Sequence, residues 1–356
     1  MKLSDLQPDI RQKYFEILDI SAKASGGAYR WSKILDLGVK RIRLVSYSKE
    51  FEPHIYKQLD YVLTEDDGNW DETLVMWKYN SEFSLGMQDF ERVYDHKDSY
   101  IWFDRNNGLI FGYNDKTNTH YYGVENLEPE EFIKQGHIFI QFLFDMLKAE
   151  NTAVIHGALV GLNDNGILLC AGGGMGKSTL SVCAMLDGFD YVSDDYLILE
   201  KTEEGLFARP IYSIVTLSPR MYSELYYDLD SKFVSNNARK NKYVLNISKY
   251  YERFSRKYPV KLIMYPNISD CKTPSVEACD KGKCVVQLVQ STIQQMQNRH
   301  DVETVKKLTN FVKDFDSYQI NLSDDIWANE KCLKEFMEQN YTKKERENEK
   351  QWAVIN

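Results

Sequence analysis

A glycine-rich segment near the middle of the chain could bind phosphate. Gly166–Cys170 is a short apolar run that predicts a buried strand, Ala171–Gly176 contains four glycines, and Leu180–Leu186 has helical periodicity. Glycine backbones can turn their N–H groups around an anion, and the following helix directs its positive N-terminal dipole at the same point. Lys177 can then reach the β- and γ-phosphates, and the Ser178 hydroxyl can bind Mg²⁺.

This segment departs from the usual phosphate loop at its first position. Ala171 stands where a glycine normally lies six residues before the lysine, and alanine does not tolerate a positive φ. The following glycines can supply the permissive positions instead. The alternative is a glycine-rich strand–helix turn that binds nothing. The candidate binding residues are Gly172, Gly173, Gly174, Met175, Gly176, Lys177, Ser178 and Thr179.

Two adjacent acids follow the loop helix. Asp194 and Asp195 come after Tyr191–Ser193, a short strand that begins past the Gly188 turn. We expect them at the carboxyl end of a parallel strand, beside the loop, where α/β proteins bind ligands. One acid would then hold Mg²⁺ with Ser178, with Asp194 as the candidate, and the other would accept a proton from a substrate hydroxyl. The alternative is an Asp pair that only caps a helix or a turn.

One histidine opens the strand before the loop strand. His156 precedes Gly157 at the start of this region. A single histidine is usually a packed or surface residue, but the position of this one would allow it to line the phosphate site.

Composition narrows the class of protein. The chain has 356 residues, a 43% apolar fraction and 27% charged residues, which is typical of a globular protein of about two domains. The net charge of −9 argues against large nucleic-acid or membrane interfaces. Because no apolar run is long enough to span a bilayer and no signal core begins the chain, we expect a cytoplasmic protein. The six cysteines match no zinc spacing, so reduced thiols are the expectation and a metal site is the alternative.

The order of the predicted elements divides the chain into three parts. Residues 1–150 are expected to form a smaller α+β domain with an antiparallel sheet over residues 74–113, including a hairpin around Asn107 and Gly108. A long buried helix is predicted over residues 128–148. Residues 151–340 are expected to form an α/β domain around the phosphate loop, and residues 341–356 a charged tail.

The segment HGALV…GILLCAGGGMGKSTL…GFDYVSDDYLIL resembles the catalytic core of the HPr kinase/phosphorylase family. The resemblance implies the kinase fold shared with phosphoenolpyruvate carboxykinase, and use of ATP and Mg²⁺ to phosphorylate a serine. Carried over, Lys177 and Ser178 would bind phosphate and metal, Asp194 and Asp195 would serve metal and base, and His156 would line the site. The close match covers about 45 residues.

Two departures separate the chain from the HPr kinases themselves. Thr179 replaces the glutamate that follows GKS in those enzymes, and their second glycine-rich signature is absent. Residues 207–219 look instead like relatives that do not act on HPr, such as kinases of lasso peptides or of free serine. We therefore expect an ATP- and Mg²⁺-dependent kinase whose acceptor is a serine-type hydroxyl on a peptide, small protein or small molecule. The alternatives are a catalytically silent nucleotide-binding regulator and a simple NTPase, and homo-oligomerisation is left open.

Overall fold

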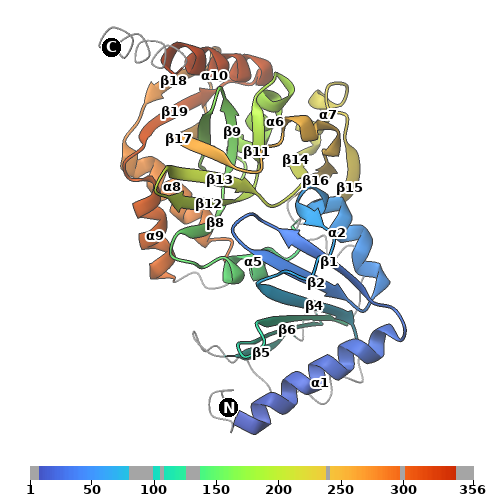
Figure 1. Ribbon diagram of the computed structural model, residues 1–356. Coiled ribbons are helices and arrows are strands. Elements are labelled where there is room, and N and C mark those ends of the chain that lie inside the picture. Colours follow the sequence, from blue (N-terminus) through green and yellow to red (C-terminus); the bar gives the residue numbers. More distant parts are fainter. Residues whose placement is uncertain are drawn as a thin grey trace, which may run out of the picture. The chain divides into compact units, whose positions relative to one another are not determined.

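The computed structural model describes residues 8–79, 99–104, 108–125, 137–237, 241–296 and 301–341. The chain divides into two compact units, Met1–Ile138 and Phe139–Asn356, each with its own sheets (Figure 1). The sequence interpretation placed this division at residue 150. The expected charged tail lies outside the described residues from residue 342 onward.

The first unit is built on a seven-stranded sheet. Its strand order is β3-β1-β2-β4-β7-β6-β5. The helices are α1 (Pro8–Gly26) and α2 (Glu52–Leu59), and the strands are β1 (Trp31–Asp36), β2 (Arg41–Ser46), β3 (Leu63–Thr64), β4 (Glu72–Lys78), β5 (Tyr100–Asp104), β6 (Leu109–Asn114) and β7 (Thr119–Val124).

This sheet is mixed, so the expectation of an antiparallel sheet is confirmed for β5, β6 and β7 and wrong for β4. Strand β4 pairs in parallel with both β2 and β7, whereas β5, β6 and β7 form an antiparallel meander. Helix α2 lies in the connection from β2 to β4 and returns the chain to the same end of the sheet, which parallel pairing requires. The β5–β6 pairing agrees with the predicted hairpin, and Gly108 has a φ of 60°, while residues 105–107 lie outside the described part.

One hydrophobic core of the first unit lies between α1 and the sheet. Helix α1 contributes Phe15 and Leu18, which pack in one buried cluster with Val75 and Trp77 of β4 and with Tyr121 of β7.

Of the predicted helix over residues 128–148, residues 128–136 lie outside the described part. Its remainder is the buried helix α5 (Ile140–Met146), which starts only after Phe139 because that residue has a left-handed φ of 65°.

The second unit is built on a nine-stranded sheet. The path of strands is β11-β9-β10-β17-β13-β12-β8, and β19 extends it by pairing with β17 and β18. The strands are β8 (Thr152–His156), β9 (Ala158–Leu162), β10 (Asn165–Leu169), β11 (Asp190–Ser193), β12 (Tyr196–Thr202), β13 (Gly205–Pro210), β17 (Tyr258–Ile268), β18 (Ser275–Ala278) and β19 (Asp316–Leu322).

Pairing in this sheet corrects one expectation. The acid pair was expected at the end of a parallel strand, but β11 pairs antiparallel with β9, and the parallel strands are β10, β17 and β19. Strand β17 continues to Ile268 and includes Pro266, which has no N–H to donate. Pro266 nevertheless keeps its place in the parallel ladder, opposite Ile320 of β19.

A small sheet that the sequence interpretation did not foresee adjoins the phosphate loop region. Strands β14 (Ile214–Leu217), β15 (Lys232–Asn237) and β16 (Lys242–Asn246) pair in the order β14-β16-β15, all antiparallel. Helix α7 (Pro219–Leu225) begins just after β14, and its cap residue Ser218 accepts a hydrogen bond from the backbone of Met221.

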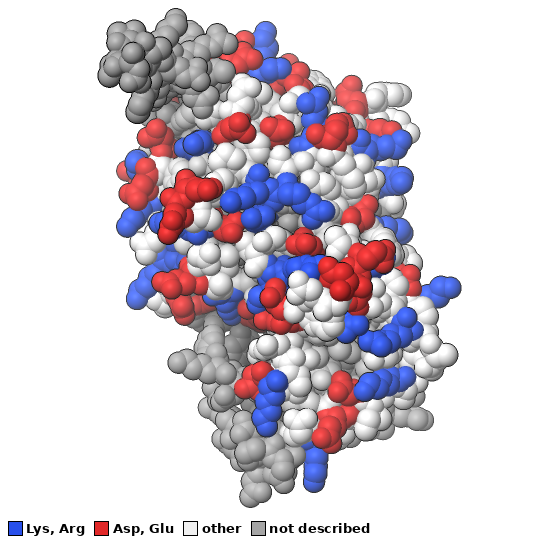
Figure 2. All heavy atoms as spheres, in the orientation of Figure 1, with Lys and Arg blue, Asp and Glu red and all other residues white. Residues whose placement is uncertain are grey.

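Helices flank the large sheet of this unit. They are α6 (Lys177–Leu186), α8 (Lys281–Ile293), α9 (Val302–Val312) and α10 (Ile326–Asn340) (Figure 1). Leu288 of α8 and Phe311 of α9 pack in one buried cluster with Leu168 of β10 and Ile263 of β17. No helix in the described parts of the chain is both long enough and apolar enough to cross a membrane. On the face drawn in Figure 2, acidic and basic side chains are interspersed among uncharged ones.

Candidate phosphate-binding site

The phosphate loop connects β10 to α6 as the sequence predicted, and its backbone explains the alanine. Gly174 and Gly176 have left-handed φ angles of 86° and 91°, so both positions favour glycine. Ala171 is fully buried and is not among the residues with a positive φ. The alanine therefore fits the backbone at the start of the loop without strain.

The side chain of Lys177 folds back into this loop. Its Nζ donates hydrogen bonds to the carbonyl oxygens of Ala171 at 2.8 Å and Gly172 at 3.2 Å, and the residue is 5% exposed. Burial lowers the pKa of the amine to about 8, against the opposing attraction of Asp195 and Asp194. A phosphate in the loop would offer this amine charged acceptors in place of two neutral carbonyls.

Asp194 lies in the bend that follows β11, beside the first turn of α6. Its Oδ2 accepts a hydrogen bond from the backbone N–H of Thr216 at 3.1 Å, and the Ser178 hydroxyl lies close enough to its carboxyl to lower its pKa. Burial and the nearby charge of Asp195 raise the pKa of Asp194 to about 7. Ionisation of this buried carboxyl is unfavourable, and a bound cation would stabilise the ionised form.

Ser178 and Asp194 fit the oxygen ligands that Mg²⁺ prefers. Within the described residues, no group of three or more His, Cys, Asp or Glu side chains could hold a metal ion. Mg²⁺ is typically bound by one or two protein oxygens together with waters and substrate phosphates, so a full protein cage is not required. Ser178 and Asp194 would hold the ion, which would supply charge neutralisation on the phosphates.

Asp195 forms a buried pair with His156. The Nε2 atom of His156 lies 2.7 Å from Oδ1 of Asp195, and the two side chains are 5% and 10% exposed. Two backbone features bring the residues together. Tyr196, the residue after Asp195, lies opposite His156 in the β8–β12 register. In addition, the N–H of Gly157, the residue after His156, donates to the Asp195 carbonyl at 3.0 Å.

The backbone of His156 is also fixed by α8. Its N–H donates to Oγ1 of Thr292 at 3.1 Å, and its carbonyl accepts from Oγ of Ser291 at 3.2 Å. The ring of Tyr196 packs beside the imidazole, with centroids 5.5 Å apart. The histidine therefore holds the carboxylate from a strand end that is itself fixed by hydrogen bonds.

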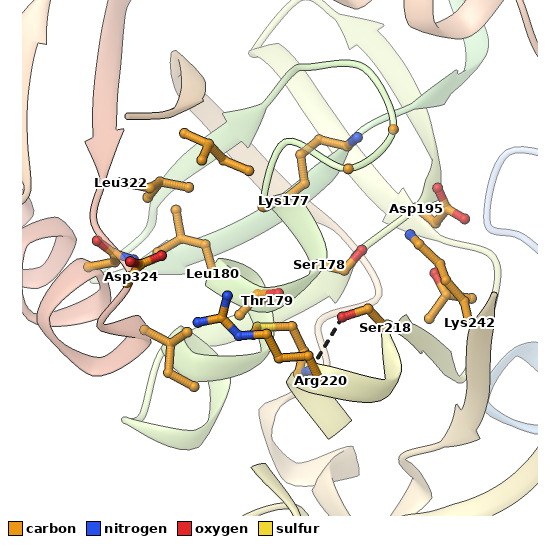
Figure 3. Close-up of a pocket in the computed structure, with 18 of the residues that line it drawn as sticks. Lys177, Ser178, Thr179, Leu180, Asp195, Ser218, Arg220, Lys242, Leu322 and Asp324 are labelled. Carbon is orange, nitrogen blue, oxygen red and sulfur yellow. Dashed lines mark hydrogen bonds between the residues drawn. The ribbon is translucent and has the colours of Figure 1, made fainter. Parts of the chain in front are cut away.

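A cavity of about 290 Å³ connects these groups, near the lower end of the range for small-molecule pockets. Figure 3 shows Lys177, Ser178, Asp195 and Lys242 directed toward one part of it. Most of the predicted site residues line the cavity: His156, Gly173, Gly174, Gly176, Lys177, Ser178, Thr179 and Asp195. Gly172, Met175 and Asp194 do not line it, and Met175 packs against the hydrophobic core instead.

Several lining residues come from elements that the sequence interpretation did not assign to the site. They are Thr216, Ser218, Arg220, Met221, Lys242, Ile268, Leu322, Ser323, Asp324, Ile326 and Asn329. Lys242 belongs to a basic run whose other members, Arg239 and Lys240, lie outside the described residues. Arg209 of β13 is not part of the lining. Its Nε is paired with Glu200 at 2.8 Å.

Arg220 is held at the cavity by its own helix. Its Nε lies 2.8 Å from Oε1 of Glu224 one turn later on α7, and Figure 3 shows its guanidinium on the same side of the cavity as Thr179 and Asp324. The Ser218-Pro219 pair indicates the start of the helix that carries Arg220, since serine before proline commonly starts a helix. Nothing in the local pattern, however, places this helix beside the phosphate loop.

Comparison with known proteins gives structural similarity at a distant level. The chain matches no model of a known protein family, and no curated protein matches its sequence. Among solved structures, the HPr(Ser) kinase/phosphatase from Coxiella burnetii is similar to this chain at 10% sequence identity and a TM-score of 0.30. The similarity covers 52% of this chain and 97% of that protein.

Proposed function

We propose that this protein is a Mg²⁺-dependent kinase that transfers the γ-phosphoryl group of ATP to a hydroxyl acceptor. The acceptor we propose is a serine-type hydroxyl on a peptide, a small protein or a small molecule. The phosphate loop supports nucleotide binding, and the buried acids supply the groups that phosphoryl transfer needs.

The observation that carries this proposal is the His156–Asp195 pair at the cavity wall. A protein that only binds nucleotide needs the loop, its lysine and a metal ligand, but it has no need of a second carboxylate held by a histidine. Asp195 lines the cavity and lies 2.7 Å from Nε2 of His156. A positioned carboxylate at this place suits the removal of a proton from an attacking hydroxyl.

The groups around the glycine-rich loop and the acid pair have distinct roles in this scheme. Lys177 would neutralise charge on the β- and γ-phosphates, and Ser178 and Asp194 would hold the cation. Lys242 lies close enough to Asp194 and Lys177 to affect the pKa of both, so it adds positive charge on the side of the acid pair. His156 would position Asp195 and would not itself contact the reacting atoms. Catalysis would then consist of positioning and charge stabilisation.

A direct experiment is transfer of radiolabel from γ-labelled ATP in the presence of Mg²⁺. The acceptors would be free L-serine, a serine-containing peptide library and water, measured as released phosphate. We expect label on a serine-type acceptor with wild-type protein and none with Asp195→Asn. Label in released phosphate alone would favour an NTPase, and Mg·ATP binding without any turnover would favour a silent binding protein.

A further inference from the structure

Three sulfur atoms meet where the phosphate loop strand ends. Cys170 is the residue before Ala171, Cys279 follows β18, and Cys284 lies in the first turns of α8. The sulfur atoms of Cys279 and Cys284 are 3.2 Å apart, and the Cys170 sulfur lies 3.4 Å from the Cys284 carbonyl oxygen. All three are free thiols. The nucleotide site uses none of them.

The start of α8 explains why two of these sulfurs touch. Asp280 is the N-cap, and its side chain accepts a hydrogen bond from the backbone of Lys283 at 3.2 Å. Cys279 and Cys284 therefore occupy the N′ and N4 positions, whose side chains pack together in a hydrophobic staple. The Cys279 backbone is also fixed, because its N–H donates to the Ser317 carbonyl at 3.0 Å. A disulfide bond would need the two sulfurs to approach by about 1 Å.

The two thiols differ in exposure and in acidity. Cys284 is fully buried, while Cys279 is partly exposed. Hydrogen bonding with Cys170, and further with Cys279 and Ser317, lowers the pKa of Cys284 to about 7 although burial opposes ionisation. Burial and the hydrogen bond to Cys284 hold the pKa of Cys279 above its usual range. Ionisation of the pair therefore favours negative charge on the inner sulfur, that of Cys284.

We propose that Cys279 and Cys284 are a reversible thiol–disulfide site, oxidised by hydrogen peroxide and restored by a small thiol. As the exposed Cys279 sulfur attacks the peroxide, the Cys284 thiolate accepts the proton of Cys279, so no free Cys279 thiolate has to form first. The O–O bond breaks, which gives a Cys279 sulfenic acid and a hydroxide that recovers the proton from Cys284 as water. The Cys284 thiolate then attacks the Cys279 sulfur, and hydroxide leaves as the disulfide forms.

Oxidation of this thiol pair by peroxide is a two-electron reaction. Two sulfurs lose two electrons in total, and the peroxide gains them as one water and one hydroxide. Two equivalents of a small thiol reverse the reaction through a mixed disulfide on the exposed Cys279. Cys279 and Cys284 flank the N-terminal turn of α8, and their sulfurs already lie 3.2 Å apart. This chemistry does not depend on nucleotide binding.

The experiment uses the full-length reduced protein with a modest molar excess of hydrogen peroxide. Free thiols are then blocked with iodoacetamide, and the peptides are mapped by mass spectrometry. We expect one disulfide, between Cys279 and Cys284, which dithiothreitol removes. Cys332→Ser, which changes a partly exposed cysteine on α10, serves as the matched control and should form the same bond.

Two outcomes would overturn the proposal. One is that both Cys279 and Cys284 remain fully alkylated after peroxide treatment of the folded wild-type protein. The other is that Cys279 accumulates as a sulfinic acid or bonds to a different cysteine. Cys279→Ser should abolish the bond, and its thermal unfolding is measured alongside. If that variant does not fold, oxidised glutathione replaces peroxide on the wild type, and the same disulfide must appear.

Discussion

The imidazole of His156 and the carboxylate of Asp195 lie 2.7 Å apart, and both are buried at the wall of the cavity beside the glycine-rich loop. His156 ends β8, and Asp195 lies in the bend between β11 and β12, so the pair links two separate parts of the chain. The histidine thereby fixes the direction of Asp195, the member of the acid pair that lines the cavity. Separate mutations can therefore distinguish the proposed positioning role of His156 from the proposed proton-accepting role of Asp195.

Removing the His156 side chain should slow transfer while leaving nucleotide binding in place. We expect His156→Ala to lower kcat by about tenfold to a hundredfold and to change KM for ATP by less than about threefold, because only the position of Asp195 is lost. His156→Gln, whose amide can replace Nε2, should recover part of the rate. Steady-state kinetics test this.

The first unit supplies a matched control for this variant. His120 and Glu72 form a similar pair with 3.0 Å between Nε2 and Oε2, far along the chain from the phosphate loop. His120→Ala should leave kcat and KM unchanged. Equal losses in both histidine variants would show that the effect reflects general stability and not the position of Asp195.

Lys177→Met should weaken Mg·ATP binding by more than about tenfold, because the loop then lacks its charged donor to the phosphates. Isothermal titration calorimetry measures the affinity. Lys201→Met changes an exposed lysine on β12 and should bind like wild type. If Lys177→Met keeps its affinity, the proposed role of the loop lysine is wrong.

Two loop glycines should respond differently to alanine. Gly176 has a φ of 91°, and a Cβ there would lie 2.5 Å from Cδ1 of Leu322, so Gly176→Ala should destabilise the second unit by about 1–2 kcal/mol and weaken nucleotide binding. A Cβ on Gly173 would meet nothing within 4 Å, and its φ is not positive. Gly173→Ala should therefore unfold like wild type. Denaturant unfolding of both variants compares them directly.

Glu330 should make stability depend on pH. This buried residue of α10 has a pKa raised to about 7, mainly by burial and also by Asp187, and its Oε1 has no hydrogen-bond partner among the described residues. A raised folded-state pKa favours the folded protein when the carboxyl is protonated. Its contribution is therefore complete below about pH 4.5 and is lost as the pH rises through about 7.

Glu330→Gln removes this titration. We expect the variant to be more stable than wild type at pH 9 by about 1–3 kcal/mol and nearly equal to it at pH 5, in denaturant unfolding. Glu335→Gln, on an exposed part of the same helix, is the control and should show no such pH-dependent difference. A Glu330→Gln variant that is less stable than wild type at both pH values would contradict this account.

The local parts of the fold could be predicted because short-range chemistry determines them. The apolar run before Ala171, the glycines and the helix beginning at Lys177 appear in the structure as β10, the loop and α6. The β5–β6 pairing followed from apolar runs flanking an Asn-Gly pair. In each case a few consecutive residues carry the signal.

The remaining features depend on pairing between distant segments. The alternation of apolar residues along one strand does not show whether a neighbouring strand runs parallel or antiparallel to it. The parallel pairing of β4 and the antiparallel pairing of β11 therefore could not be predicted from the sequence pattern. Lys242 and Arg220 reach the cavity through a separate small sheet and its adjoining helix. Their polar and tyrosine-rich surroundings have no strong period, and a charge run is more often only solvated.

The central claim is that Asp195 takes part in transfer and not in nucleotide binding. Its most direct test combines Mg·ATP titration calorimetry with γ-phosphoryl transfer by wild type and Asp195→Asn. We expect the variant to bind Mg·ATP within about threefold of wild type and to transfer phosphate at least about a hundredfold more slowly. Equal transfer rates in the two proteins would contradict the account.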